Sequence, residues 1–257
     1  MTARRAKDSG RASRPQRNVL VVDVGGTNVK VSATGKRTPR KIASGPTMTA
    51  TNMVKAVKQL AADWRYDVVA LGYPGPVRGG RPTAEPKNLA TGWVGFDFAK
   101  AFVCPVKVIN DAAMQALGSY ERGRILFLGL GTGLGSALIT DGVLVPMELA
   151  HLLYRKGCTY EDYVGLRGLQ RFGKKKWRRY VTDIVMALKH ALQADYVVLG
   201  GGNAKQLKRL PEGARLGNNS HAFIGGFRLW EAAWKDERSA CVVQSGSARE
   251  EHGRRST

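Results

Sequence analysis

Short apolar runs alternate along this chain with segments in which apolar residues recur at helical spacing. Continuous runs bounded by glycine, proline or acidic residues predict strands, and these strands fall within residues 18–32, 67–72, 105–109, 124–145 and 195–202. Apolar positions three and four residues apart predict helices, which we place at residues 49–64, 112–120, 177–192 and 222–234. Either Thr49 or Thr51 is placed to cap the first helix. This alternation of strands and helices is typical of an α/β protein.

One supersecondary unit occurs twice in this pattern. Residues 18–32 read as a strand, a glycine turn and a second strand, and residues 124–145 repeat this order and add an Asp-Gly hairpin. We therefore predict two α/β domains that face each other across a cleft. Their predicted extents are 18–110 for a smaller N-terminal domain completed by the helix at 222–234, and 111–221 for a larger C-terminal domain. Residues 1–17 and 235–257 are predicted to be disordered tails.

Composition narrows the class of protein. The chain has 257 residues, 43% of them hydrophobic, and five tryptophans, as expected for a globular protein with a substantial core. No apolar run approaches the roughly 18 to 20 residues that cross a bilayer, and the basic N-terminus lacks the apolar segment of a secretory signal. We expect a cytoplasmic protein that does not bind a membrane.

The three cysteines, Cys104, Cys158 and Cys241, are far apart and odd in number. They form neither a disulfide framework nor a C-x-x-C zinc pair. We interpret them as free thiols.

Charge is the unusual bulk property, because 41 Lys and Arg residues face 20 Asp and Glu, for a net charge of +21. The two predicted tails carry +5 and +1, which leaves +15 on the folded body. Such a field favours an anionic partner and accelerates its approach. Nucleic acid, polyphosphate and nucleotides all remain candidates, as does a basic surface that only confers solubility.

Three glycine clusters follow predicted strands, at residues 25–26, 131–133 and 200–202. Glycine permits a close ligand approach, and consecutive backbone N–H groups can converge on an anion. The spacing fits neither a P-loop nor a dinucleotide-binding G-x-G-x-x-G turn. Each cluster alone is compatible with an ordinary hairpin turn, but Asp23 and Asp111 beside them favour a phosphate site.

Six motifs follow one another in a fixed order: DVGGTNVK, GYPGPV, NLATGW, INDAAMQALG, LGLGTGLGSALITDGVLVPMELAH and VVLGGGN. This ordered series resembles the ROK sugar kinases of the actin-like ATPase superfamily, and it is most similar to their polyphosphate glucokinase branch. The resemblance spans roughly residues 18–234. It implies two ribonuclease H-like domains and phosphoryl transfer from polyphosphate, ATP or both to the C6 hydroxyl of glucose or a related hexose such as mannose.

The resemblance also implies how the donor is bound. Phosphates would lie against the first turn (Gly25, Gly26, Thr27 and Lys30) and the second turn (Gly131, Thr132 and Gly133). The third cluster, Gly200, Gly201 and Gly202, would border the nucleotide or the equivalent donor channel. Asp23 would orient Mg²⁺ through water.

Asp111 corresponds in this resemblance to the general base that accepts the proton of the sugar hydroxyl. The alternative is an Asp that only caps the following helix. Sugar hydroxyls would contact Asn88, Asn110, Asp111, Glu148, His151 and Glu161. Carboxylates, amides and imidazole suit a sugar because it presents several hydroxyls that need partners, and the Glu-x-x-His spacing places Glu148 and His151 on one helical face or turn.

The chain departs from the family pattern in two places. At the position before the histidine the family has glycine, whereas this chain has Ala150. The extra methyl group either crowds the sugar pocket or only shifts the turn. Most family members carry a Cys-rich zinc loop after that histidine. Here the corresponding segment has only Cys158, so no zinc is expected, as in the polyphosphate-using relatives.

Residues 166–179 contain seven basic and no acidic residues. This segment is either a solvated helix start or a track for a long polyanion, whose binding would depend strongly on salt. We expect a polyphosphate- or ATP-dependent hexose kinase, a homodimer as is common among relatives, with no specific nucleic-acid partner. Two alternatives stay open, a sugar-sensing regulator without activity and a kinase for another sugar such as an acylated amino sugar.

Overall fold

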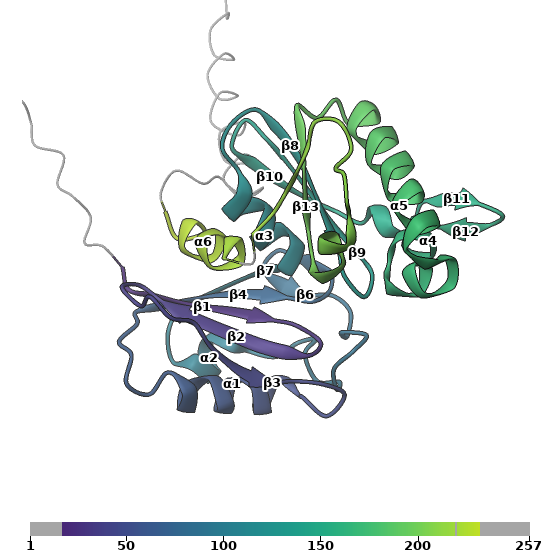
Figure 1. The fold of residues 1–257 in the computed structure, drawn as a ribbon. Coiled ribbons are helices and arrows are strands. Elements are labelled where there is room, and N and C mark those ends of the chain that lie inside the picture. Colours follow the sequence, from purple (N-terminus) through teal and green to yellow (C-terminus); the bar gives the residue numbers. More distant parts are fainter. Residues whose placement is uncertain (1–16, 219, 232–257) are drawn as a thin grey trace, which may run out of the picture.

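The computed structural model describes residues 17–218 and 220–231, and they form two α/β lobes (Figure 1). The first lobe has a five-stranded sheet of order β3-β2-β1-β4-β7. Its strands are β1 (Val19–Val24), β2 (Asn28–Ala33), β3 (Arg40–Ala43), β4 (Val68–Tyr73) and β7 (Val106–Asn110). Strands β1, β4 and β7 are parallel, whereas β2 and β3 are antiparallel to their neighbours.

The second lobe repeats this plan. Its sheet has the order β10-β9-β8-β13-β14, with β8 (Arg124–Leu130), β9 (Leu134–Thr140), β10 (Val143–Met147), β13 (Tyr196–Gly200) and β14 (Ala214–Leu216). Strands β8, β13 and β14 are parallel, and β9 and β10 are added as antiparallel hairpins. The predicted duplication of strand, glycine turn and strand is therefore confirmed.

Smaller elements complete both lobes. Two short hairpins pair β5 (Val77–Arg78) with β6 (Arg81–Pro82), and β11 (Leu153–Arg155) with β12 (Cys158–Thr159). The helices are α1 (Ala50–Leu60), α2 (Phe98–Phe102), α3 (Asp111–Ser119), α4 (Tyr160–Val164), α5 (Leu166–Ala191) and α6 (His221–Arg228), with short 3₁₀ turns η1 (Leu149–His151) and η2 (Gly202–Gln206). None of the helices in the described ranges is long and apolar enough to cross a membrane.

Strand β1 shows how the core is divided. Leu20, Val22 and Val24 point to a cluster shared with α1 and α2, whereas Val19 and Val21 point to the opposite face. Because successive side chains in a strand point to opposite faces, the apolar run at residues 19–22 is buried on both sides of the sheet.

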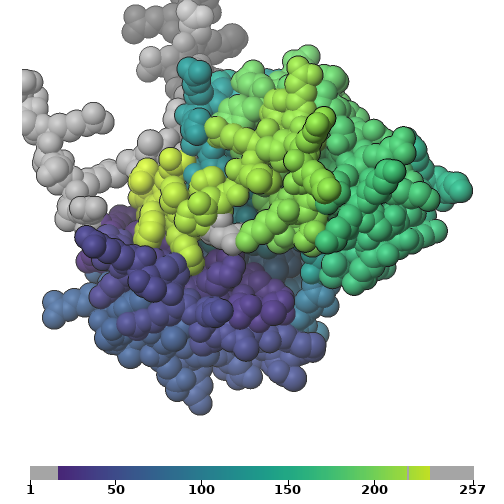
Figure 2. Space-filling view, in the orientation of Figure 1, coloured from purple at the N-terminus to yellow at the C-terminus, as the bar shows by residue number. Residues whose placement is uncertain are grey.

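Helices α3 and α6 lie between the two sheets (Figure 1), and Figure 2 shows α6 against both lobes at one side of their junction. Their residues share one apolar cluster with strands of both sheets. The two helices approach closely at Gly118 and Gly225, where an added Cβ would collide with the backbone of the other helix. The junction of the lobes is therefore a packed core. The predicted domain boundaries remain a prediction.

Three predicted helix boundaries were wrong. The helix predicted at 177–192 is α5, which already begins at Leu166 and is kinked at Gly173, where φ is +69°. The helix predicted at 49–64 ends at Leu60, although Thr49 caps it as expected and Trp64 is still buried in the turn that follows. The helix predicted at 222–234 is α6, which ends at Arg228. Its Arg228 guanidinium donates to the carbonyls of Leu117 and Tyr120 at 2.8 Å each, and the chain leaves the helix to place the Trp230 indole on the Val69 carbonyl. Both predicted tails lie outside the described residues, apart from Arg17.

Candidate active site

The carboxyl ends of β1, β4 and β7 bring the predicted catalytic side chains to one edge of the first sheet. Asp23 is in register with Gly72, which is in register with Ile109. Asp111 follows two residues later, as the first residue of α3. Ligands of open α/β sheets bind at this edge, because the parallel strands all end there.

Gly72 is a contributor that we did not predict. A Cβ on Gly72 would collide with the Met114 side chain and would lie 3.6 Å from the Cα of Asp111. The glycine therefore allows the first turn of α3, and with it Asp111, to lie close to the strand ends. The only sequence signal was a glycine at the end of an otherwise apolar strand, a place that can mark close approach by another backbone.

Asn110 is the N-cap of α3. Its side-chain oxygen accepts the backbone N–H groups of Ala112 at 2.9 Å and Ala113 at 3.2 Å, and its amide nitrogen donates to the Gly75 carbonyl at 3.0 Å. These bonds satisfy backbone groups that a helix start leaves without partners. Asn110 therefore has a structural task already, and its predicted contact with the sugar remains a prediction.

Asp111 is not the cap, and its carboxylate lies beside the helix start. Its Oδ1 accepts the N–H of Ala112 at 2.7 Å. Burial is the main cause of a pKa of about 7 at Asp111; the negative charges of Asp23 and Glu148 contribute to this rise, and hydrogen bonds from backbone N–H groups oppose it. A carboxylate with a pKa near neutrality can take a proton from a weakly acidic hydroxyl more effectively than an ordinary one.

The first glycine turn joins β1 to β2. Gly25 donates its N–H to the carbonyl of Asn28 at 3.0 Å, and Thr27 is exposed at the tip. Asp23 and Lys30 are cross-strand partners below the turn, with 3.7 Å between Nζ and Oδ2. Burial raises the pKa of Asp23, and Lys30 opposes that rise. The turn thus presents backbone N–H groups, a hydroxyl, a carboxylate and an ammonium within one hairpin.

The second glycine turn joins β8 to β9 and has a carboxylate behind it. Gly131 donates to the carbonyl of Gly133 at 3.1 Å, and Thr132 is exposed. Glu161 of α4 accepts the N–H of Leu134 at 3.2 Å, and an added Cβ on Gly133 would collide with that carboxylate. The predicted sugar ligand Glu161 therefore lies directly against the predicted phosphate turn.

The third glycine cluster lies beside the second turn and is not a hairpin. Gly200 pairs with Gly129 of the neighbouring parallel strand, and Gly201 has a φ of +81° and a position at which an added Cβ would collide with the backbone of Leu130. Asn203 donates to the carbonyl of Gly131 at 2.8 Å, and Gly202 is exposed. The structure thus brings the two predicted donor-binding segments of the second lobe together.

The predicted sugar-binding residues come from both lobes. Asn88 lies beside the first turn, because an added Cβ on Gly26 would be 3.0 Å from its Cβ. Glu148 begins the η1 turn that ends at His151, which places the Glu-x-x-His pair on one turn. Burial raises the pKa of Glu148, whereas the charges of His151 and Lys87 lower it. Lys87 was not predicted.

A magnesium site would depend on few protein ligands. Within the two described ranges, no cluster of three or more His, Cys, Asp or Glu side chains could hold a metal ion. Mg²⁺ commonly keeps several waters and binds through one or two carboxylates together with substrate phosphates. Asp23, a largely buried carboxylate beside the first glycine turn, fits such a site.

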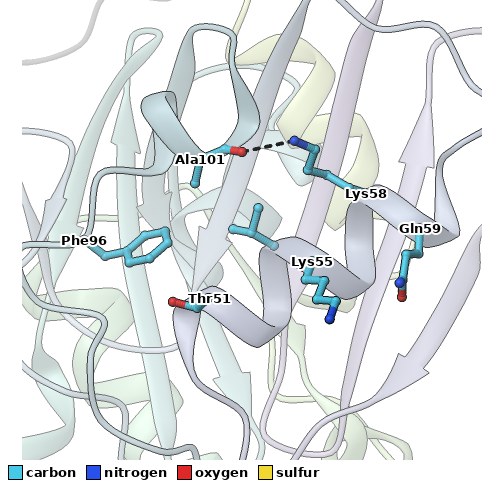
Figure 3. A pocket seen from close by; sticks show the side chains of 7 residues that line it. Thr51, Lys55, Lys58, Gln59, Phe96 and Ala101 are labelled. Atoms are coloured by element: carbon cyan, nitrogen blue, oxygen red, sulfur yellow. Dashed lines mark hydrogen bonds between the residues drawn. The ribbon is translucent and has the colours of Figure 1, made fainter.

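Two surface hollows of the first lobe lie elsewhere. One, of about 400 Å³, is a groove between α1 and α2 lined by Thr51, Val54, Lys55, Lys58, Gln59, Phe96 and Ala101, where Lys58 donates to the Ala101 carbonyl at 3.3 Å (Figure 3). The other, of about 430 Å³, lies by the β5–β6 hairpin and the segment at 95–99. Neither is lined by a residue predicted for the site.

Comparison with solved structures defines the class of fold. The protein is similar to an inorganic polyphosphate/ATP-glucomannokinase from Arthrobacter sp. strain KM, with a TM-score of 0.71, 23% sequence identity, and coverage of 83% of this chain and 98% of that one. It is also similar to a ROK family glucokinase from Streptomyces griseus in complex with glucose and AMPPNP, with a TM-score of 0.66, 17% identity, and coverage of 82% and 97%. The fold is therefore the two-lobed α/β fold of these sugar kinases.

Sequence comparison identifies the family. The chain is 25% identical over 213 residues to the polyphosphate glucokinase of Mycobacterium tuberculosis (strain CDC 1551 / Oshkosh), a match that covers 74% of this chain and 80% of that protein. Residues 19–146, about half of the chain, match the model of the ROK family. The chain belongs to the ROK family, near its polyphosphate glucokinases.

Proposed function

We propose that this protein is a hexose kinase that transfers a phosphoryl group from polyphosphate or ATP to the C6 hydroxyl of glucose or a closely related hexose. The observation that carries the proposal is the placement of Asp111. It lies at the strand edge it shares with Asp23, next to the first glycine turn, and burial raises its pKa to about 7. The named activity of the M. tuberculosis relative supports the same reaction.

The proposed reaction is an in-line phosphoryl transfer. The C6 hydroxyl of the sugar gives its proton to the Asp111 carboxylate, and its oxygen forms a bond to the terminal phosphorus of the donor. The bond between that phosphorus and the bridging oxygen breaks, and the shortened donor leaves with the electron pair. A general base near neutral pKa is suited to this proton transfer, and most of the remaining rate comes from positioning and electrostatics.

The two glycine turns would hold the donor from opposite lobes. In the first hairpin, Lys30 would add positive charge beside the phosphates. Its ion pair with Asp23 would hold that carboxylate next to them. Mg²⁺ bound there would neutralise part of the charge that develops on the leaving phosphate. The exposed hydroxyls of Thr27 and Thr132, with the backbone N–H groups of both turns, would donate hydrogen bonds to phosphate oxygens.

A basic surface on the second lobe favours polyphosphate as a donor. Exposed cations of α5 are Arg167, Arg171, Lys174, Lys175, Lys176 and Arg179, and those of the segment after the third glycine cluster are Lys205, Lys208 and Arg209. Arg178 joins the two segments, because its Nε donates to the Gln206 carbonyl at 2.6 Å. The cations thus flank the predicted donor channel, where a long polyanion would release counterions on binding.

A matrix of donors and sugars tests the proposal. Purified protein with Mg²⁺ is assayed with polyphosphate or ATP against glucose, mannose and N-acetylated amino sugars. We expect glucose 6-phosphate or mannose 6-phosphate with at least one donor. Absence of product from every donor and hexose would refute the kinase assignment, and product only from an acylated amino sugar would reassign the acceptor.

The donor is tested by removing charge from the basic surface. Replacing Lys174, Lys175 and Lys176 with glutamine should raise the KM for polyphosphate about tenfold and flatten its salt dependence, with little change in the KM for ATP. The matched control replaces three exposed lysines of the first lobe, Lys41, Lys55 and Lys100, with glutamine. Equal effects of the two triple variants would mean that net charge, not this surface, attracts the donor.

A further inference from the structure

Lys87 and Glu161 form an ion pair that joins the two lobes, with 3.5 Å between Nζ and Oε1. The two residues are 74 positions apart in the sequence. Other ion pairs, such as Arg40–Asp63 and Arg215–Glu121, lie within one lobe. We propose that Lys87 is a positioning residue whose ion pair with Glu161 ties the two lobes together over the acceptor sugar and strengthens sugar binding.

The segment that carries Lys87 is anchored to the first lobe at several points. We call residues 85–94 the acceptor loop. The Glu85 carboxylate accepts the N–H groups of Trp93 at 3.0 Å and Val94 at 3.2 Å, so the two ends of the loop are joined. Just before the loop, the Tyr73 hydroxyl donates to the Ala84 carbonyl at 2.8 Å. The loop is thus held in one shape, with Lys87 next to Asn88.

Glu161 is held equally firmly on the second lobe. It lies in the first turn of α4, which has a capping box between Thr159 and Asp162. One carboxylate oxygen of Glu161 accepts the N–H of Leu134 behind the second glycine turn, and the other faces Lys87. Glu161 thus connects the acceptor loop to the turn predicted to hold phosphate.

Exposure indicates how the pair would act. The Lys87 side chain is 73% exposed, whereas that of Glu161 is 19% exposed. A flexible lysine therefore reaches from the surface to a fixed carboxylate. Exposed ion pairs contribute little to folding, and the lobes are already joined by the core around α3 and α6. The effect of the pair should therefore appear in ligand binding and in the mobility of the acceptor loop.

The positive charge of Lys87 also lowers the pKa of Glu148, the second acidic residue predicted to bind the sugar. Glu148, Glu161 and Asn88 would surround the sugar in the proposed function, on which this inference rests for the identity of the ligand. With Lys87 in place, the two carboxylates are partly neutralised and the first lobe stays close to the second. Without it, both the alignment and the charge balance of the sugar site change.

Steady-state kinetics with saturating donor test the positioning role. We expect Lys87→Met to raise the KM for the hexose about two- to fivefold, as for loss of one partly exposed ion pair, with kcat nearly unchanged. Lys87→Arg should restore most of the affinity, because it keeps the charge and the reach. Lys55→Met, at an exposed lysine of α1 (Figure 3), is the matched control and should leave both constants unchanged. An unchanged KM in Lys87→Met, or a loss confined to kcat, would overturn the proposal.

Hydrogen exchange provides a test that needs no activity. In the unliganded protein, amides of the acceptor loop and of Leu134 should exchange several-fold faster in Lys87→Met than in the wild type, and Lys87→Arg should resemble the wild type. Equal exchange in all three proteins would contradict the proposal. If the wild type phosphorylates no sugar, the proposed function fails while this measurement still decides whether the pair joins the lobes.

Discussion

The two glycine hairpins share a backbone plan but differ one residue pair below the turn. In the first lobe the pair next to the turn is Val24↔Val29, and the pair below it is Asp23↔Lys30. In the second lobe the corresponding pairs are Leu130↔Leu134 and Gly129↔Gly135. The same position in the hairpin is thus occupied by two opposite charges in one lobe and by two glycines in the other.

The difference shows that the two copies of the duplicated unit use this position for different purposes. A Cβ on Gly135 would lie 2.8 Å from the Cβ of Ala112, closer than packed side chains allow, so this glycine lets α3 pack on the second sheet. The second hairpin uses the position to receive the helix that begins with Asp111, and its charge comes from Glu161 on α4 instead. The first hairpin uses the position to hold its own carboxylate and ammonium.

The largest effect is expected from Asp111→Asn, which removes the base supplied at the junction of the two lobes. The kcat should fall by a factor of roughly 10² to 10⁴, the usual contribution of general-base catalysis. The control is Asp97→Asn, the same chemical change at the N-cap of α2. A variant that keeps a tenth of wild-type activity would exclude Asp111 as the base.

The same variant should be more stable than the wild type at alkaline pH. In the folded protein the pKa of Asp111 is raised from 3.8 to about 7, so ionisation costs stability as the pH rises through this range. Asn avoids this cost, which gives a gain of about 4 kcal/mol in the free energy of unfolding at pH 8 and little gain at pH 4. Urea unfolding at both values measures it, and a loss of stability at pH 8 would show that Asp111 has a structural role.

The next largest effect should come from the charged pair of the first hairpin. Asp23→Asn should lower kcat about a hundredfold at ordinary Mg²⁺ concentration and raise the concentration needed for half-maximal rate, because phosphoryl transfer depends on a correctly held metal. Lys30→Met should lower kcat less, because Lys30 supplies only a positive charge at the edge of the phosphate site. Titration of activity with Mg²⁺ separates the two, and equal Mg²⁺ dependence in Asp23→Asn and the wild type would refute the metal role.

The pattern along the chain predicted those parts of the molecule that depend on local signals. The strands around both hairpins and the Asp-Gly turn at Asp141 are confirmed, because buried apolar runs and turn residues are read within a few positions. The packing role of Gly135 and the pairing of Lys87 with Glu161 were missed. Both depend on segments distant in the sequence, and so does the early end of α6 at Arg228.

The pH dependence should follow the ionisation of Asp111. Only the carboxylate accepts a proton, so kcat/KM should rise about tenfold from pH 6 to pH 8 and level off above a midpoint near 7. The negative charge of Asp23 raises this pKa, so in Asp23→Asn the residual activity should have a lower midpoint. A pH profile measured for both proteins checks this, and an unchanged or higher midpoint in the variant would contradict the coupling between the two carboxylates.

The smallest effect is expected at the glycine pair of the second hairpin. Gly129 and Gly135 are cross-strand partners, but only one of them should be sensitive to substitution. Gly135→Ala forces α3 away from the sheet, and we expect a loss of about 1 to 3 kcal/mol in unfolding free energy, as for other overpacked cores, with a few-fold lower kcat as Asp111 shifts. Gly129→Ala meets its nearest neighbour, Phe127, at 3.4 Å, an ordinary contact, and should be neutral or slightly stabilising because alanine restricts the unfolded chain. Thermal unfolding and kcat of the two variants decide the matter. Equal losses in both would mean that glycine is needed for the hairpin itself, whereas a loss only at Gly135 would show that the second lobe uses this position to place the helix that carries the base.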